Sequence, residues 1–234
     1  MNDVWQVVHR ERRELAADLA SLEPEAWDTP SLCPGWTVHD VLAHLVDDAK
    51  TTWAGFAWEL LKARFDFDAL NARGVARERS FDPRETLKTF GAVSGRSSSA
   101  PVPLNTRLVE VFVHGEDIRR PLGLSREHRL PSLVDALKYQ LSTPSDFGGG
   151  RERAAGLVLE ATDTDFRWDT ARQGAGRKNR GKAKRQMPAG PAVSAPVVRG
   201  STLALLLAVS GRPVFPDELE GDGAGSFPTR PRRS

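Results

Sequence analysis

The sequence contains a single cysteine and lacks any long apolar run. Cys33 is the only cysteine among 234 residues, so an internal disulfide is excluded, as expected for a reducing cytoplasm. No stretch approaches the roughly 20 consecutive apolar residues that a membrane-spanning helix requires. The N-terminus, Met-Asn-Asp-Val-Trp, lacks the pattern of a secretory signal peptide. We therefore expect a cytoplasmic protein with no membrane partner.

Acidic residues are missing from one short basic segment, 172–185. Its charged residues are Arg172, Arg177, Lys178, Arg180, Lys182, Lys184 and Arg185. Subtracting these seven charges from the net charge of +2 leaves −5 for the remaining chain. Such a segment could bind a polyanion such as a nucleic acid. It lacks interleaved aromatics and any recognisable reading motif, so we expect no specific nucleic-acid partner and interpret 171–190 as a basic, disordered insertion.

Helical periodicity dominates the N-terminal part of the chain. Apolar residues recur every three or four positions in the segments 4–22, 37–64, 82–93 and 104–120. Thr37 and Asp40 have the spacing of a helix N-cap close to a capping box. A shorter helix is predicted over 131–141, whereas 65–80 has no clear pattern. We expect an up-and-down four-helix bundle over 1–145.

The C-terminal part has a different pattern, and Gly148 to Gly150 resemble a linker that precedes it. Residues 156–168 alternate like one strand, and 197–200 like a second short strand. A strongly apolar helix is expected over 201–210. The sequence therefore predicts a mainly α protein, in which a small α/β domain (150–225) follows the bundle and ends in a tail (226–234).

Glu110 and His114 are candidate metal ligands. They lie four residues apart, which places them on one face of the predicted helix 104–120. That helix is too apolar for a solvated surface, and buried polar groups without compensation are costly. A divalent metal would compensate them, although an ordinary surface pair is the alternative. His44, on the stripe of Val41 and Leu45, is expected to point inward, as a third ligand or as a hydrogen-bonded core histidine.

Two imidazole nitrogens and one carboxylate oxygen suit Zn²⁺ with an open position, or another first-row divalent ion. An open position indicates catalysis or ligand capture. Asp48 follows His44 by one helical turn. It is a candidate fourth ligand, or an acceptor that supports a metal-binding imidazole by taking its N–H, and a solvated carboxylate is the alternative. His39, in the first turn of the same helix, is expected to be exposed and without a role.

Two stretches of the chain resemble a known family. The stretch Pro30-Ser-Leu-Cys-Pro-Gly-Trp-Thr-Val-His-Asp-Val-Leu-Ala-His-Leu45 resembles the N-terminal signature of the mycothiol-dependent maleylpyruvate isomerase family, one of the DinB-like metal-binding four-helix bundles. The stretch from Glu110 to Gly123, with His-Gly-Glu-Asp-Ile-Arg-Arg-Pro-Leu-Gly at its end, resembles its second signature. The small domain, with Gly221-Asp-Gly223, is similar to the family's C-terminal domain, and the insertion 171–190 departs from it.

The resemblance implies a divalent metal, typically zinc, held by His44, Glu110 and His114. It also implies mycothiol as a thiol co-substrate, whose metal-bound thiolate would attack a small electrophile such as maleylpyruvate. The expected enzyme is a cis-trans isomerase or a thiol transferase. Arg107, Arg119 and Arg199 are candidates for binding an anionic substrate. A non-catalytic metal-binding sensor or scaffold is the alternative, and the oligomeric state is left open.

Overall fold

The computed structural model describes residues 4–170 and 195–232. The chain divides into two compact units, unit 1 (1–136) and unit 2 (137–234), with the division inside α7 (Leu130–Ser142). The domain bounds expected from the sequence, 1–145 and 150–225, therefore stay a prediction. The basic insertion expected at 171–190 lies outside the described residues. Within the described part of the chain, no helix is long and apolar enough to cross a membrane.

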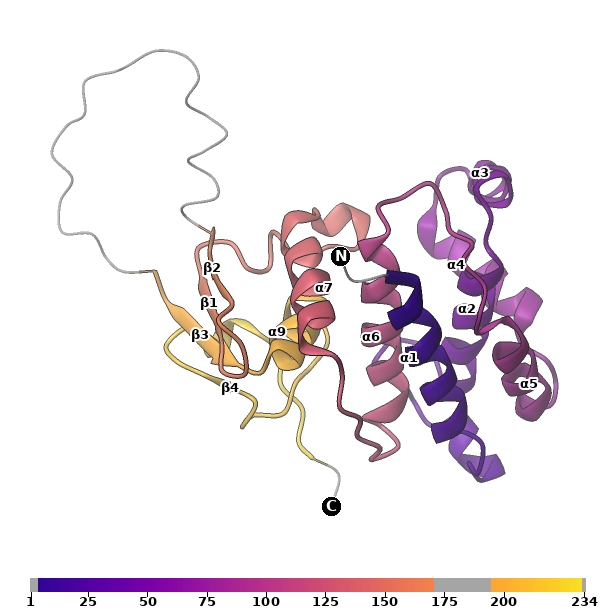
Figure 1. Ribbon diagram of the computed structural model, residues 1–234, viewed down its shortest axis with the longest axis horizontal. Helices are drawn as coiled ribbons and strands as arrows, with labels where there is room; N and C mark the ends of the chain where they lie inside the picture. The colour runs from indigo at the N-terminus through magenta and orange to yellow at the C-terminus, as the bar shows by residue number, and fades with distance from the viewer. Residues whose placement is uncertain (1–3, 171–194, 233–234) are drawn as a thin grey trace, which may run out of the picture. The chain divides into compact units, whose positions relative to one another are not determined.

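Unit 1 contains four helices that pack against one another around one core, which confirms the predicted bundle (Figure 1). They are α1 (Val4–Asp18), α2 (Val38–Lys50), α5 (Pro83–Val93) and α6 (Asn105–Arg119). α1 and α2 each pack against both α5 and α6. Buried apolar side chains from these helices form one core around Leu15, Leu42, Leu45, Phe90 and Ile118.

The start of α2 is fixed by the capping box that the sequence predicts. The backbone N–H of Asp40 donates to Oγ1 of Thr37 at 3.2 Å, and the N–H of Thr37 donates to Oδ2 of Asp40 at 2.9 Å. These bonds satisfy backbone donors that have no partner within the first turn. Because the helix begins at a fixed residue, the side that buries Val41 and Leu45 is fixed too, and His44 lies beside that side.

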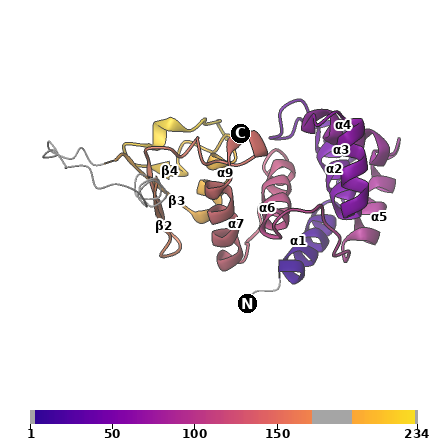
Figure 2. The same cartoon turned by 90° about the horizontal axis from the view of Figure 1, so that it is seen from above.

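The helix predicted over 37–64 is two helices, which corrects the prediction. Thr51 Oγ1 donates to the carbonyl of Asp47 at 2.9 Å, and Thr52 Oγ1 accepts from Gly55 N–H as the N-cap of α3 (Trp53–Lys62). Hydroxyl groups that bond to nearby backbone compete with helix continuation in this way. The unassigned segment 65–80 holds α4 (Phe67–Glu78). α4 lies beside α2, and α3 beside α4 (Figure 2).

Unit 2 holds a four-stranded sheet in the order β2-β1-β3-β4. Its elements are β1 (Val158–Ala161), β2 (Arg167–Asp169), β3 (Val197–Gly200), β4 (Leu219–Glu220) and α9 (Thr202–Val209), which packs on β1 and β3. β1 pairs parallel with β3 and antiparallel with β2, and β3 pairs antiparallel with β4. The single strand expected over 156–168 is therefore a hairpin, because residues 162–166 reverse the chain.

Short 3₁₀ helices complete the described elements: η1 (Pro24–Asp28), η2 (Ser145–Phe147) and η3 (Ala224–Ser226). The Gly-Asp-Gly segment at 221–223 anchors β3. Asp222 Oδ1 accepts from Val197 N–H at 2.6 Å. Gly221 has a φ of 101°, and a Cβ there would lie 2.3 Å from the carbonyl oxygen of Val197. Only glycine fits this close approach.

Candidate metal centre

His44, Glu110 and His114 come together between α2 and α6. Nε2 of His44 lies 3.4 Å from Oε2 of Glu110, and Nε2 of His114 lies 3.2 Å from the same oxygen. The side chains are 12%, 24% and 14% exposed, so the cluster is mostly buried but still accessible to solvent. The two imidazole rings meet edge to face, with centroids 4.8 Å apart.

The arrangement fits a divalent cation. One possible ligand atom from each residue lies within 4.8 Å of the other two. Two donors at the usual 2.0–2.1 Å from a tetrahedral zinc ion are about 3.3 Å apart. The two nitrogen–oxygen separations match that spacing, although they are also hydrogen-bond distances. Nδ1 of His44 is buried and has no hydrogen-bond partner among the described residues. Its Nε2 is therefore the ring nitrogen that faces a polar partner, Oε2 of Glu110.

Asp117 orients His114. Its Oδ2 lies 2.9 Å from Nδ1 of His114, and its side chain is fully buried. A carboxylate at Nδ1 holds the proton there and leaves Nε2 for a metal, the usual support for a metal-binding histidine. Leu32 N–H donates to the backbone carbonyl of Asp117 at 3.2 Å, which ties this turn of α6 to the loop before α2.

The charges of the cluster are strongly coupled. Burial lowers the pKa of His114, but the hydrogen bonds that its ring donates to Asp117 and Glu110, together with their negative charges, outweigh burial and raise that pKa to about 9. Burial raises the pKa of Glu110, but hydrogen bonds and charges from His114 and His44 hold it well below its usual range. Without a cation, an imidazolium therefore compensates the Glu110 carboxylate. A divalent ion would take the place of that proton.

The partners of Asp48 are arginines and not an imidazole, so the structure does not support its expected role as an acceptor for a metal-binding imidazole. Its Oδ2 accepts from Arg12 at 3.3 Å, and its Oδ1 pairs with Arg107. All three side chains are buried. Burial is the main reason that the pKa of Arg12 is lowered, and the charge of Arg107 adds to this effect. The charge of Asp48 and, more weakly, that of Glu110 oppose it. This ion-pair network therefore lies near Glu110.

The three arginines expected to bind substrate have carboxylate partners of their own. Arg107 pairs with Asp48, and Arg119 Nε donates to Asp18 at 2.7 Å and is fully buried. Arg199 belongs to unit 2, where it pairs with Glu160 at 2.9 Å. The structure thus does not bring Arg119 into contact with the cluster, and the substrate-binding role of all three arginines stays a prediction.

The positions of Trp36 and His39 were not predicted from the sequence. The ring of Trp36 lies 5.3 Å from that of His44 and forms a wall of the site. His39, expected to be exposed, is buried, and its Nε2 lies 2.9 Å from Oγ1 of Thr86 on α5. A buried imidazole needs such a partner, so His39 joins two helices of the bundle.

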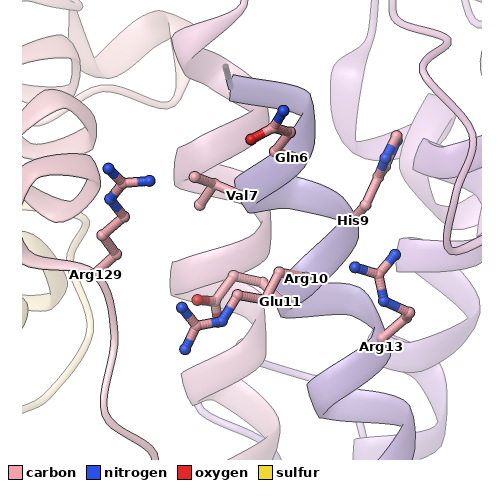
Figure 3. Close-up of a pocket in the computed structure, with 7 residues that line it drawn as sticks. All are labelled: Gln6, Val7, His9, Arg10, Glu11, Arg13 and Arg129. Atoms are coloured by element: carbon pink, nitrogen blue, oxygen red, sulfur yellow. The ribbon is translucent and has the colours of Figure 1, made fainter. Parts of the chain in front are cut away.

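A separate hollow of about 420 Å³ lies on α1 (Figure 3). It is lined by Gln6, Val7, His9, Arg10, Glu11, Arg13 and Arg129. Glu11 is engaged with Nδ1 of His128 at 2.9 Å, and Arg10 with Glu14 at 2.8 Å. The hollow contains no residue of the cluster, and its carboxylate, Glu11, already pairs with the imidazole of His128.

The comparisons with known proteins agree with the resemblance found in the sequence. Residues 8–92 match the family model described as mycothiol maleylpyruvate isomerase N-terminal domain. This match includes His44 and ends before Glu110 and His114. No significant match is found among curated proteins.

Two solved structures share the fold of the whole chain. A mycothiol-dependent maleylpyruvate isomerase aligns with a TM-score of 0.57, and a histidine-to-alanine mutant of such an enzyme with 0.58. Each is 16% identical, and each alignment covers 99% of this chain and 95% of the other. At this identity the likeness concerns the fold alone. Residues 8–92 are therefore similar to the mycothiol maleylpyruvate isomerase N-terminal domain, and the fold of the chain is similar to that of the two isomerases.

Proposed function

We propose that the chain is a divalent-metal-dependent enzyme that uses mycothiol to isomerise maleylpyruvate or a similar small electrophile. The carrying observation is the convergence of two imidazole Nε2 atoms on one oxygen of Glu110, at 3.4 and 3.2 Å. The family match and the fold of the related isomerases supply the reaction class. His44, Glu110 and His114 would hold the ion, and zinc suits this donor set.

A divalent ion at this position supplies a positive charge that lowers the pKa of a thiol, and the thiolate is the reactive nucleophile. The residues of the chain prepare that position. Asp117 holds the proton of His114 on Nδ1 and so directs Nε2 toward Glu110. The indole ring of Trp36 packs beside the ring of His44.

The reaction class needs no net oxidation or reduction. A thiolate adds to one carbon of a cis double bond that is conjugated to a carbonyl, and the electron pair of the double bond moves onto the carbonyl oxygen as an enolate. The resulting single bond rotates, the electron pair returns, and loss of the thiolate gives the trans product. If the enolate were instead protonated on carbon and the adduct released, the same chemistry would be a thiol transfer. Both outcomes use the same nucleophile, so isomerase and transferase remain the two forms of this proposal.

A turnover assay tests the proposal. Zinc-loaded protein is incubated with maleylpyruvate, with and without mycothiol, and products are followed by chromatography and mass spectrometry. We expect thiol-dependent formation of the trans isomer or of a thiol adduct, and its loss in His44→Ala. His9→Ala is the matched control, because His9 lies on α1 and binds the carbonyl of Arg96. Failure of metal-loaded wild-type protein to form either product contradicts the proposal.

The alternatives from the sequence make different predictions. A metal-binding sensor or scaffold would retain the ion but give no turnover with any electrophile. A polyanion-binding protein would depend on the basic segment 172–185, which lies outside the described residues. Its affinity would fall with salt and with neutralisation of that segment, and would be indifferent to His44→Ala.

A further inference from the structure

The outward face of α3 is apolar. Trp53, Trp58 and Leu61 are 65%, 59% and 57% exposed. Ala54 and Ala57, between them along the helix, are exposed as well. Positions 53, 54, 57, 58 and 61 lie on one side of a helix with 3.6 residues per turn. These five residues therefore form a continuous apolar stripe in which two small residues lie between large ones.

The opposite side of α3 is the one that packs against unit 1. Phe56, Glu59 and Leu60 are partly buried there, and α3 contacts α4. An ordinary surface helix points its apolar stripe at the core and its polar side at solvent. In α3 the outward stripe contains no charged residue, and no described residue of unit 1 buries it.

The turn after α3 enlarges this surface. Arg64 and Phe65 have φ values of 54° and 66°, in the left-handed region that non-glycine residues seldom adopt. Phe65 is 68% exposed, and Phe67, at the start of α4, is 44% exposed. Backbone strain of this kind is retained mainly where the displayed side chain has a role. We call residues 53–67 the α3 surface.

The size of the α3 surface suits a protein interface. Large aromatic side chains offer roughly 150–250 Å² each when fully covered. With the exposures above, covering the five large side chains would remove on the order of 500 Å² of apolar surface per copy. Stable interfaces bury about 800 Å² per partner, with an apolar centre and a polar rim. The apolar stripe would form the centre of such an interface, and the polar residues around it would supply the remaining buried area as its rim.

The charges around the surface favour a second copy of the same chain. Asp66 and Glu59 balance Lys62 and Arg64. Glu59 lies at the edge of the packed side, where its side chain is 24% exposed and pairs with Lys62 at 3.1 Å. A membrane surface rich in anionic lipids attracts clustered positive charge, which this rim does not offer. A two-fold axis brings one patch against an identical patch, and a rim with equal numbers of both charges can be self-complementary. We propose that the α3 surface is a homodimer interface, with α3 packed against α3 of a second copy about an axis near Ala57.

Analytical ultracentrifugation of the full-length protein tests this interface, which is independent of the proposed activity. We expect wild-type protein to sediment at about twice its 25.7 kDa, and Trp58→Asp to sediment as a monomer with a dissociation constant raised at least about 100-fold. Phe81→Asp is the matched control, because Phe81 is 104% exposed and lies outside the α3 surface. It should remain a dimer.

A crosslinking experiment covers the case in which Trp58→Asp does not fold. In a Cys33→Ser background, Ala57→Cys should give a disulfide-linked dimer on mild oxidation, whereas Lys88→Cys on α5 should not. Three results would overturn the interface. They are a wild-type monomer at about 100 µM, equal dissociation of Phe81→Asp, and monomeric protein that binds vesicles of phosphatidylcholine and phosphatidylserine through Trp58.

Discussion

Asp117 Oδ2 lies 2.9 Å from His114 Nδ1, and the carboxylate is fully buried one turn further along α6. This contact fixes which nitrogen of His114 faces Glu110. We expect Asp117→Ala to weaken zinc binding by about 10- to 100-fold, because the ring loses its orientation and part of its basicity. Competition with a chromogenic chelator at constant pH measures the change.

Asp48→Asn is the matched comparison, because Asp48 is the other buried carboxylate near the site. Its partners are arginines, so zinc affinity should change little. The free energy of unfolding should fall by about 3–5 kcal/mol, because Arg12 loses its buried carboxylate. Equal losses of zinc affinity in the Asp48 and Asp117 variants would contradict the assignment of Asp117.

Zinc binding should depend on pH through His114. Its pKa is raised to about 9 because the bonds to Asp117 and Glu110 outweigh burial. The protonated ring cannot bind a metal through Nε2, so the ion must displace that proton. Affinity should therefore rise about tenfold per pH unit between pH 7 and 9, and level off above. Calorimetry in two buffers should detect about one proton released at pH 7, and a value near zero would contradict the pairing.

His128 should make stability depend on pH independently of the metal. Its Nδ1 lies 2.9 Å from Glu11 and its Nε2 3.3 Å from Glu116, and the three side chains are buried. Burial lowers the pKa of His128, but these hydrogen bonds and charges raise it to about 9. Because the folded pKa exceeds the unfolded value of about 6.5, the stabilisation is complete below pH 6.5 and is lost toward pH 9.

Urea unfolding of zinc-loaded wild type and His128→Asn tests this linkage. The difference in unfolding free energy should be roughly 3 kcal/mol at pH 6 and should shrink as pH rises through 9. The protein is loaded with zinc so that His114, whose pKa is also about 9, does not take up a proton in the same pH range. A difference that stays constant from pH 6 to 9 would show that His128 contributes by packing alone.

The bundle and the clustering of His44, Glu110 and His114 were predictable because both follow local spacing. The stripe of Val41 and Leu45 indicates the inward side of α2, and Glu110 and His114 are one turn apart on α6. The break between α2 and α3 was missed, because it depends on hydroxyl–backbone bonds of Thr51 rather than on hydrophobic periodicity.

Long-range partners explain the remaining errors. Asp48 has helical spacing from His44, but its contacts are Arg12 and Arg107, which lie 36 and 59 residues away in the chain. His39 is buried because Thr86 of α5 packs against it, which the pattern of α2 alone does not indicate. Asp117 was recoverable, since it follows His114 by three residues, the spacing of side chains that meet on a helix.

Metal content tests the central claim, that His44, Glu110 and His114 hold a divalent ion. Protein purified without an affinity tag would be measured by mass spectrometry as wild type, His44→Ala, His114→Ala and His9→Ala. We predict about one zinc per chain in the wild type and in His9→Ala, and its loss in the other two. A wild type that contains no metal and takes up none when zinc is added would contradict the claim.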